Sequence, residues 1–126
     1  SIPLFSSGGN SGSISVAVQA IGYAVQMGAK LSNNSWGYQG ASSLSLAAAI
    51  VGARNAGHIF VAAAGNDGVD NDTNSYFPTN YYGVIDNMVS VAAFDRNDKM
   101  ATFSQYGNNR VTLGAPGVAI YSTFRN

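Results

Sequence analysis

The segment that most constrains the fold of this chain is residues 58–66, with the sequence HIFVAAAGN. An uninterrupted apolar run that ends in a turn signal is typical of a strand covered on both faces. The run narrows to three alanines, and small side chains at the carboxyl end of a strand leave room for a ligand. Asn66 then brings an amide with two N–H donors to that space. Because ligands of open α/β sheets bind beyond the carboxyl ends of the strands, we expect Asn66 to be an electrostatic donor in an active site.

The composition excludes several classes of partner. The 126 residues suffice for one domain with a core, and the six Lys and Arg residues are balanced by six acidic residues, all of them Asp. There is no basic field to attract nucleic acid and no basic amphipathic helix, so neither a nucleic acid nor a membrane is expected as a partner. The absence of cysteine excludes disulfides and thiolate chemistry. Low charge and a richness in Gly, Ser and Asn favour a secreted or extracellular protein.

Helices and strands are predicted to alternate along the chain. Apolar residues at helical spacing predict a helix over residues 14–27, with Ser13 as its N-cap and Gly28 as its stop. A second helix is predicted over residues 43–55, before Gly57. Strands are predicted over residues 2–5, 30–36, 58–64, 88–94 and 111–115, with extended structure at 118–121 and a polar turn at 95–99.

This alternation is typical of the α/β class, with a parallel sheet and flanking helices. The strands over 30–36 and 58–64 are expected to lie close together with their carboxyl ends aligned. That arrangement would bring Ser35-Trp36-Gly37 and Ala63-Ala64-Gly65-Asn66 to one rim of the sheet.

Six short motifs occur in an order that resembles the central part of the subtilisin-like serine proteases, or subtilases. The motifs are Asn33-Asn34-Ser35-Trp36-Gly37, Val61-Ala62-Ala63-Ala64-Gly65-Asn66-Asp67, Phe77-Pro78, Val89-Ser90-Val91-Ala92-Ala93, Phe103-Ser104 and Ala115-Pro116-Gly117. The resemblance implies a partial subtilisin-like three-layer fold. It also implies that residues 1–126 are the central fragment of a single peptidase domain, between the catalytic His and Ser motifs.

The resemblance also implies roles for individual residues. Asn66 would donate its side-chain N–H to the oxyanion of the tetrahedral intermediate; the alternative is an Asn that merely adopts a positive φ in a Gly-Asn turn. Ser35, Trp36, Gly37, Ala63, Ala64 and Gly65 would form the walls of the primary specificity pocket, and Trp36 could equally be a core residue. Ser11 and Gly12 would pair with the substrate backbone, or else form a flexible loop.

Tyr76-Phe77-Pro78 resembles a family segment in which the bond before proline tends to be cis. By the same resemblance Tyr76 falls near the base of the specificity pocket, where a bulky side chain would shorten the pocket.

His58 is the only histidine, but it starts its strand and therefore lies at the end opposite to the rim. It also lacks the sequence context of the family's catalytic His, so we interpret it as a structural or surface histidine. Ser32 stands where such a strand usually carries an aliphatic residue, and a buried hydroxyl needs a partner.

No cofactor and no metal are predicted. The acidic loop of Asp67, Asp70, Asp72 and Asn74 fails the EF-hand pattern, because Ser75 and Tyr81 stand where Gly and Glu are required. A solvated loop is favoured, with calcium binding left open. Some subtilases bind a cation near the turn that corresponds to residues 78–88, but Arg110 and Thr112 occupy positions where that site uses acids.

None of the three triad motifs of the family is present in the 126 residues. The sequence therefore predicts part of a serine endopeptidase that works through an acyl-enzyme, with peptide or protein substrates and the remaining segments of the parent domain as partners. This chain alone is expected to be inactive. The alternative is a stand-alone, non-catalytic folding or peptide-binding module of subtilase origin.

Overall fold

A computed structural model of the chain describes residues 12–122. The strand predicted over residues 2–5 lies outside the described residues. In chain order the elements are α1 (Ile14–Gln26), β1 (Leu31–Asn34), β2 (Tyr38–Gln39), α2 (Leu44–Asn55), β3 (Ile59–Ala63), β4 (Tyr76–Phe77), the 3-10 helix η1 (Thr79–Tyr81), β5 (Met88–Phe94) and β6 (Leu113–Pro116).

Serine caps start both helices; the Ser13 cap was predicted, whereas Ser43 was predicted to be the first residue of its helix. The Ser13 hydroxyl accepts a hydrogen bond from the Val16 N–H at 3.3 Å, and Ser43 does the same for Leu46 at 3.3 Å. A cap of this kind stabilises a helix by about 1 kcal/mol. After each helix the chain turns at a glycine of positive φ, 76° at Gly28 and 72° at Gly57, a backbone conformation that β-carbons disfavour.

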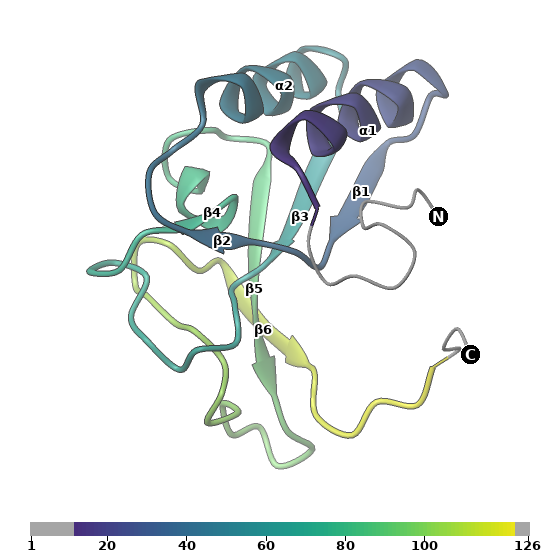
Figure 1. Cartoon of the computed structure of the whole chain (residues 1–126). Coiled ribbons are helices and arrows are strands. Elements are labelled where there is room, and N and C mark those ends of the chain that lie inside the picture. Colours follow the sequence, from purple (N-terminus) through teal and green to yellow (C-terminus); the bar gives the residue numbers. More distant parts are fainter. Residues whose placement is uncertain (1–11, 123–126) are drawn as a thin grey trace.

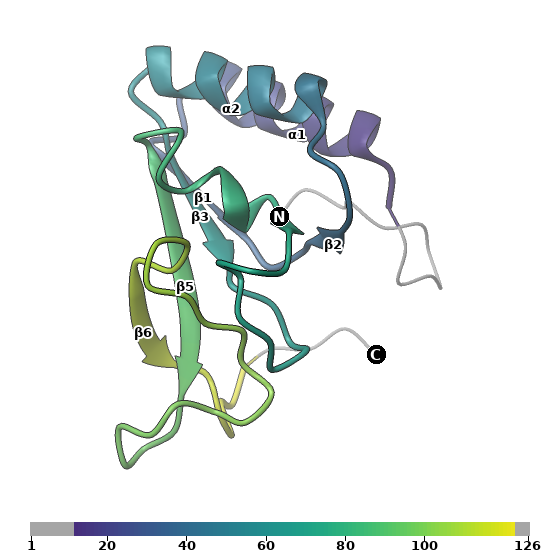
Figure 2. The same cartoon turned by 90° about the vertical axis from the view of Figure 1, so that its left-hand side faces the viewer.

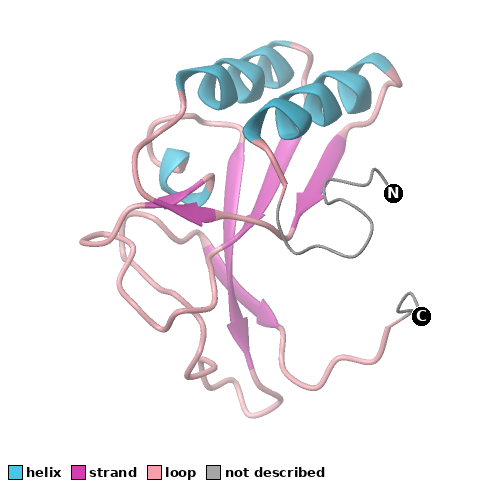
Figure 3. Ribbon diagram, in the orientation of Figure 1, coloured by secondary structure: helices cyan, strands magenta, loops and turns pink. Residues whose placement is uncertain are grey.

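The main sheet is parallel throughout, with the strand order β1-β3-β5-β6. Figure 3 shows the four strands running in the same direction, with their arrowheads away from the end where α1 and α2 lie. Asn34 pairs with Ala62, so the carboxyl ends of β1 and β3 are aligned as predicted. The antiparallel pair of β2 and β4 was not predicted, because strands of two residues are too short to show a pattern.

The core lies on one side of this sheet. In Figures 1 and 2, α1 and α2 lie side by side and, with η1, on the same side of the sheet. The core consists of apolar residues of these elements, of β3, β4 and β5, and of the loop between η1 and β5: Ala17, Ile21, Leu46, Ile50, Ala53, Phe60, Ala62, Phe77, Tyr81, Ile85 and Met88.

The other face of the sheet is open within residues 12–122. Burial alternates along β3, where Phe60 is fully buried and Ile59 is 47% exposed. The expectation of a strand covered on both faces is therefore wrong for the described residues, because both of their helices pack on the same face. Residues 118–121 also form no strand, and no helix of the described part is long and apolar enough to cross a membrane.

Candidate active site

The carboxyl ends of β1 and β3 bring two of the predicted segments together. Ser35, Trp36 and Gly37 follow β1 directly, and residues 64–66 follow β3 directly, next to them across the aligned ends. Ser11 lies outside the described residues. Gly12 precedes the N-cap of α1, and no hydrogen bond ties it to the rim in the described part of the chain.

Asn66 projects from the rim into solvent. The chain leaves the sheet at Gly65, whose φ is 119°, and the next side chain is exposed. Asn66 itself does not have a positive φ, so the turn's left-handed conformation belongs to the glycine and not to the asparagine. Within residues 12–122, no hydrogen bond takes up either of the two side-chain N–H donors of Asn66.

Two buried amides that the sequence analysis missed hold this turn. Gln105 donates its backbone N–H to the Gly65 carbonyl at 3.0 Å, and its Nε2 to Asn71 Oδ1 at 2.8 Å. Asn71 in turn donates its Nδ2 to the Ala64 carbonyl at 2.9 Å. Because Gln105 is 0% and Asn71 1% exposed, these bonds are shielded from water and fix the backbone from which Asn66 projects.

A third missed residue is Thr79, which begins η1 just after the Phe77-Pro78 bond. That bond is cis, as the resemblance implied. The Thr79 hydroxyl donates to the Ala63 carbonyl at 2.6 Å, which anchors the last residue of β3. Thr79 is fully buried, and nothing in its local sequence distinguishes it from a surface threonine.

The ring of Tyr76 lies between the two predicted pocket walls. A β-carbon added at Gly37 would lie 2.3 Å from Tyr76 Cε1, and one added at Gly65 would lie 3.1 Å from the same atom. The ring therefore contacts the backbone of both walls. Burial raises the pKa of the Tyr76 hydroxyl above its ordinary value, and the nearby Asp67 carboxylate raises it further. The phenol is thus neutral at physiological pH.

Trp36 faces the core and the rim at once. Its ring packs edge-to-face on Phe60, with the centroids 6.3 Å apart at an interplanar angle of 89°, and its Nε1 donates to Asn34 Oδ1 at 3.3 Å. The two alternatives for Trp36, a pocket wall and a core residue, are therefore compatible.

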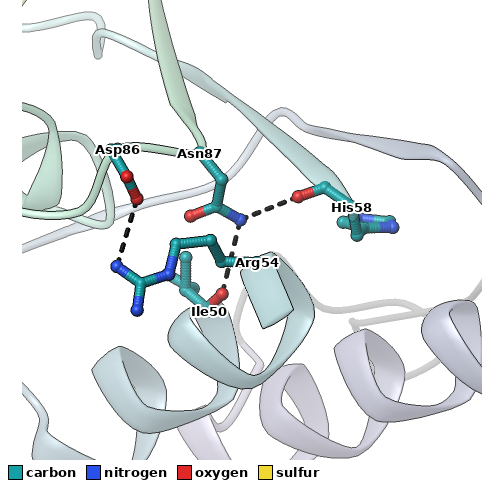
Figure 4. Close-up of polar contacts among 5 residues, drawn as sticks. All are labelled: Ile50, Arg54, His58, Asp86 and Asn87. Atoms are coloured by element: carbon teal, nitrogen blue, oxygen red, sulfur yellow. Dashed lines mark hydrogen bonds and ion pairs between the residues drawn. The ribbon is translucent and has the colours of Figure 1, made fainter. Parts of the chain in front are cut away.

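His58 lies far from the rim, where the chain enters β3. Its side chain is buried, at 1% exposure, and Figure 4 shows its backbone carbonyl accepting a hydrogen bond from Asn87 Nδ2, at 2.8 Å. The same amide reaches the Ile50 carbonyl at 3.3 Å, beside the Arg54–Asp86 ion pair. The interpretation of His58 as a structural residue is confirmed.

A hollow of about 390 Å³ lies on the open face of the sheet. Its lining is mostly apolar and includes Val61, Ala63, Val91, Ala93, Ala115 and Gly117. Asn66 is not among its lining residues, so the predicted space beside the Asn66 amide stays a prediction.

The acidic loop is occupied by internal hydrogen bonds. Asn109 donates its backbone N–H, at 3.1 Å, and its Nδ2, at 3.0 Å, to the Asp72 carboxylate. In the described part of the chain, no three His or Asp side chains gather as metal ligands. Near the turn after Pro78, Arg110 Nη1 donates to the carbonyls of Asn80 at 3.1 Å and Tyr82 at 3.0 Å, so a guanidinium takes up these two oxygens.

Comparison with known proteins gives a consistent result. The sequence model of the Subtilase family (Peptidase S8) matches residues 2–125. The chain is 39% identical to the thermophilic serine proteinase of Bacillus sp. (strain AK1) over 113 residues, which are 90% of this chain and 26% of that protein. It is 40% identical to thermitase of Thermoactinomyces vulgaris over 114 residues, 90% of this chain and 38% of thermitase.

Solved structures of proteases also match the fold of this chain. The epidermin leader peptide processing serine protease of Staphylococcus aureus matches with a TM-score of 0.78 and 25% identity, over 90% of this chain and 32% of that chain. A protease of Pseudoalteromonas arctica matches with a TM-score of 0.75 and 34% identity, over 89% and 34% of the two chains. The chain thus spans between about a quarter and two fifths of the length of these four proteins.

Proposed function

Because the chain belongs to the subtilase family, we propose that residues 1–126 are the central part of a single subtilisin-like serine endopeptidase domain. The reaction is hydrolysis of peptide bonds through an acyl-enzyme. The parent protein is a hydrolase, and this chain contributes transition-state stabilisation and substrate binding to it.

The free amide of Asn66 is the observation that carries this proposal. Acyl transfer places negative charge on the carbonyl oxygen of the scissile bond, and a fixed donor stabilises that charge without reorganising. Gln105 and Asn71 hold the backbone of the turn that carries Asn66, and within the described residues no hydrogen bond takes up the Asn66 side-chain N–H groups. The second donor of the oxyanion hole is the backbone N–H of the nucleophilic serine, which a further segment supplies.

Substrate binding falls to the two segments beside Asn66. Ser35, Trp36 and Gly37 form one wall of the primary pocket, and Ala63, Ala64 and Gly65 form the other. Ser11 and Gly12 pair with the extended substrate backbone as an added strand. Small residues suit both walls because a substrate side chain has to pass between two backbones.

Tyr76 limits this pocket to small side chains at the residue preceding the scissile bond. Its ring already contacts the backbone at Gly37 and Gly65, which leaves little depth between the walls. A neutral phenol in that position also offers no charge to pair with a basic substrate side chain. The substrates are therefore peptides or proteins cleaved after small residues such as alanine.

The chain needs the remaining segments of the parent domain as its partners. Asn66 without a nucleophilic Ser, a general-base His and its Asp has no reaction to stabilise, so the 126-residue chain alone is inactive. The low charge and the lack of cysteine support a secreted protein, whose substrates are extracellular peptides.

Labelling with a fluorophosphonate tests this proposal against a stand-alone binding module. The protein expressed from the complete reading frame is expected to react at one serine, and the 126-residue chain is expected to stay unlabelled. A complete reading frame without catalytic His and Ser motifs would favour the stand-alone module. Labelling of the 126-residue chain itself would contradict its inactivity.

A further inference from the structure

A line of hydrogen bonds runs along β1 from the buried histidine to the rim. His58 Nδ1 lies 2.8 Å from the Ala29 carbonyl, which can only accept, so this nitrogen carries the proton. With the proton on Nδ1, Nε2 accepts a hydrogen bond from the Ser32 hydroxyl, which lies 3.0 Å away. His58 is therefore the hydrogen-bond partner that the Ser32 hydroxyl needs inside the strand.

The line continues through Asn34 to the indole. Asn34 Nδ2 donates to Ser32 Oγ at 2.8 Å and to the carbonyls of Ser32 and Val61 at 3.1 and 3.2 Å. These acceptors fix the orientation of the amide, so Oδ1 points the other way and accepts the Trp36 Nε1–H at 3.3 Å. The three side-chain bonds from Trp36 to Asn34, from Asn34 to Ser32 and from Ser32 to His58 all donate in the direction of His58, and bonds aligned in this way polarise one another.

The spacing of these residues explains why β1 is polar. Ser32, Asn34 and Trp36 are two residues apart, and alternate side chains of a strand lie on one face. At about 3.3 Å per residue, the step from Ser32 to Trp36 covers about 13 Å. The set of His58, Ser32, Asn34 and Trp36, here called the relay, thus links the amino end of β3 to the substrate rim.

A hollow borders the indole. It has a volume of about 350 Å³, lies between α1 and β1, and its lining includes Ser32, Asn34 and Trp36. The ring packs on the core, edge-to-face on Phe60, and its hydrogen bond to Asn34 adds a directional restraint beside this hollow. The other end of the relay is rigid, because His58 is buried and Asn87 holds its carbonyl, as drawn in Figure 4.

We propose that His58 is a positioning residue: through Ser32 and Asn34 it holds the Trp36 indole in the orientation that lines the substrate pocket. This inference rests on the proposed function for its link to substrate, while the relay itself stands on the hydrogen bonds. It assigns the only histidine of the chain a role at the rim without placing it in the catalytic machinery.

The only tryptophan of the chain makes the relay directly measurable, because the indole Nε1–H gives a single NMR cross-peak. Ser32→Ala removes the middle hydroxyl and keeps the β-carbon, and Ser32→Thr keeps the hydroxyl. Ser90→Ala is the matched control, since Ser90 is fully buried on β5 and its hydroxyl has no hydrogen-bond partner among residues 12–122. In the folded chain, Ser32→Ala is expected to move the indole cross-peak, whereas Ser32→Thr and Ser90→Ala leave it near its original position.

Peptide hydrolysis by the protein from the complete reading frame provides the second readout. Ser32→Ala is expected to raise KM roughly two- to tenfold, the equivalent of one hydrogen bond, with kcat unchanged. If the indole cross-peak keeps its position in Ser32→Ala, the relay is overturned, whether or not peptides are cleaved. A cross-peak that moves while KM stays constant overturns the link to substrate. A protein that cleaves no peptide at all overturns the proposed function, and with it that link, while the NMR result still decides the relay.

Discussion

The side chain of Gln105 occupies the space that a β-carbon on Gly65 would need: its Oε1 lies 1.5 Å from that position. Two segments 40 residues apart in the sequence are therefore fitted to each other at the base of the candidate oxyanion donor. The backbone N–H of Gln105 also donates a hydrogen bond to the Gly65 carbonyl, at 3.0 Å, which stabilises the same contact. The position of Asn66 depends on this fit.

Gly65→Ala is expected to destabilise the fold by about 1–3 kcal/mol, because the buried Gln105 has to move and the backbone has a positive φ. Urea unfolding measures the change. Gly52→Ala is the control: it lies on the exposed side of α2 with open space around it, so it should stabilise the chain by about 0.5–1 kcal/mol. Equal effects of the two substitutions would contradict the close fit at Gly65.

Tyr76→Gly is expected to deepen the specificity pocket, because it removes the ring between the two walls. In the protein from the complete reading frame, a library of fluorogenic peptides should show new cleavage after Phe and Leu, with kcat/KM for these substrates raised about 10- to 100-fold. Tyr76→Phe keeps the ring and serves as the control, for which the preference for small residues should persist. An unchanged profile for Tyr76→Gly would refute the limiting role of Tyr76.

Asp95→Asn is expected to change the pH dependence of stability. The backbone N–H groups of Lys99, at 3.0 Å, and Asn97, at 2.8 Å, donate to Asp95 Oδ1 and lower the pKa of this carboxyl. A lowered folded-state pKa stabilises the fold above the unfolded value of about 3.9, and the gain is lost as the pH falls through the folded value.

The variant should therefore be less stable than the original chain at pH 7, and the difference should shrink at pH 3. Urea unfolding at the two pH values measures it. Asp98→Asn is the control, because no backbone N–H of the described residues donates to the Asp98 carboxylate. A difference for Asp95→Asn that is the same at both pH values would rule out the charge as its source.

The sequence predicted the elements that local patterns specify. Both helices carry a Ser cap and a terminal glycine, and the strand at Met88–Phe94 has the predicted bounds. The alignment of the carboxyl ends of β1 and β3, which brings Ser35 and Gly65 to one rim, followed from the parallel order of the strands. The prediction that Asn66 is an electrostatic donor came from its place after a strand end, and the family motif added the specific prediction that it donates to the oxyanion.

Hydrogen bonds between residues that lie far apart in the chain could not be predicted from the sequence. Gln105, Asn71 and Thr79 hold the rim by bonds to backbone carbonyls of the β3 end, and polar residues of this kind are indistinguishable from surface residues until the fold places them. The same holds for Ser32 and His58, which are 26 residues apart and satisfy each other inside the fold. The sequence predicted that both faces of β3 are covered, and this was wrong because an apolar run shows that a strand can be buried but not which elements pack on it.

The kcat of an Asn66→Ala variant tests the central claim most directly. Loss of this donor is known from a subtilisin itself to lower kcat by about 10²–10³, and that magnitude is carried over to this chain. In the protein from the complete reading frame, kcat is expected to fall by this factor with KM little changed, while Asn74→Ala, in the neighbouring loop, leaves both constants near their original values. A kcat for Asn66→Ala within about threefold of the original would contradict the assignment of Asn66 as the oxyanion donor.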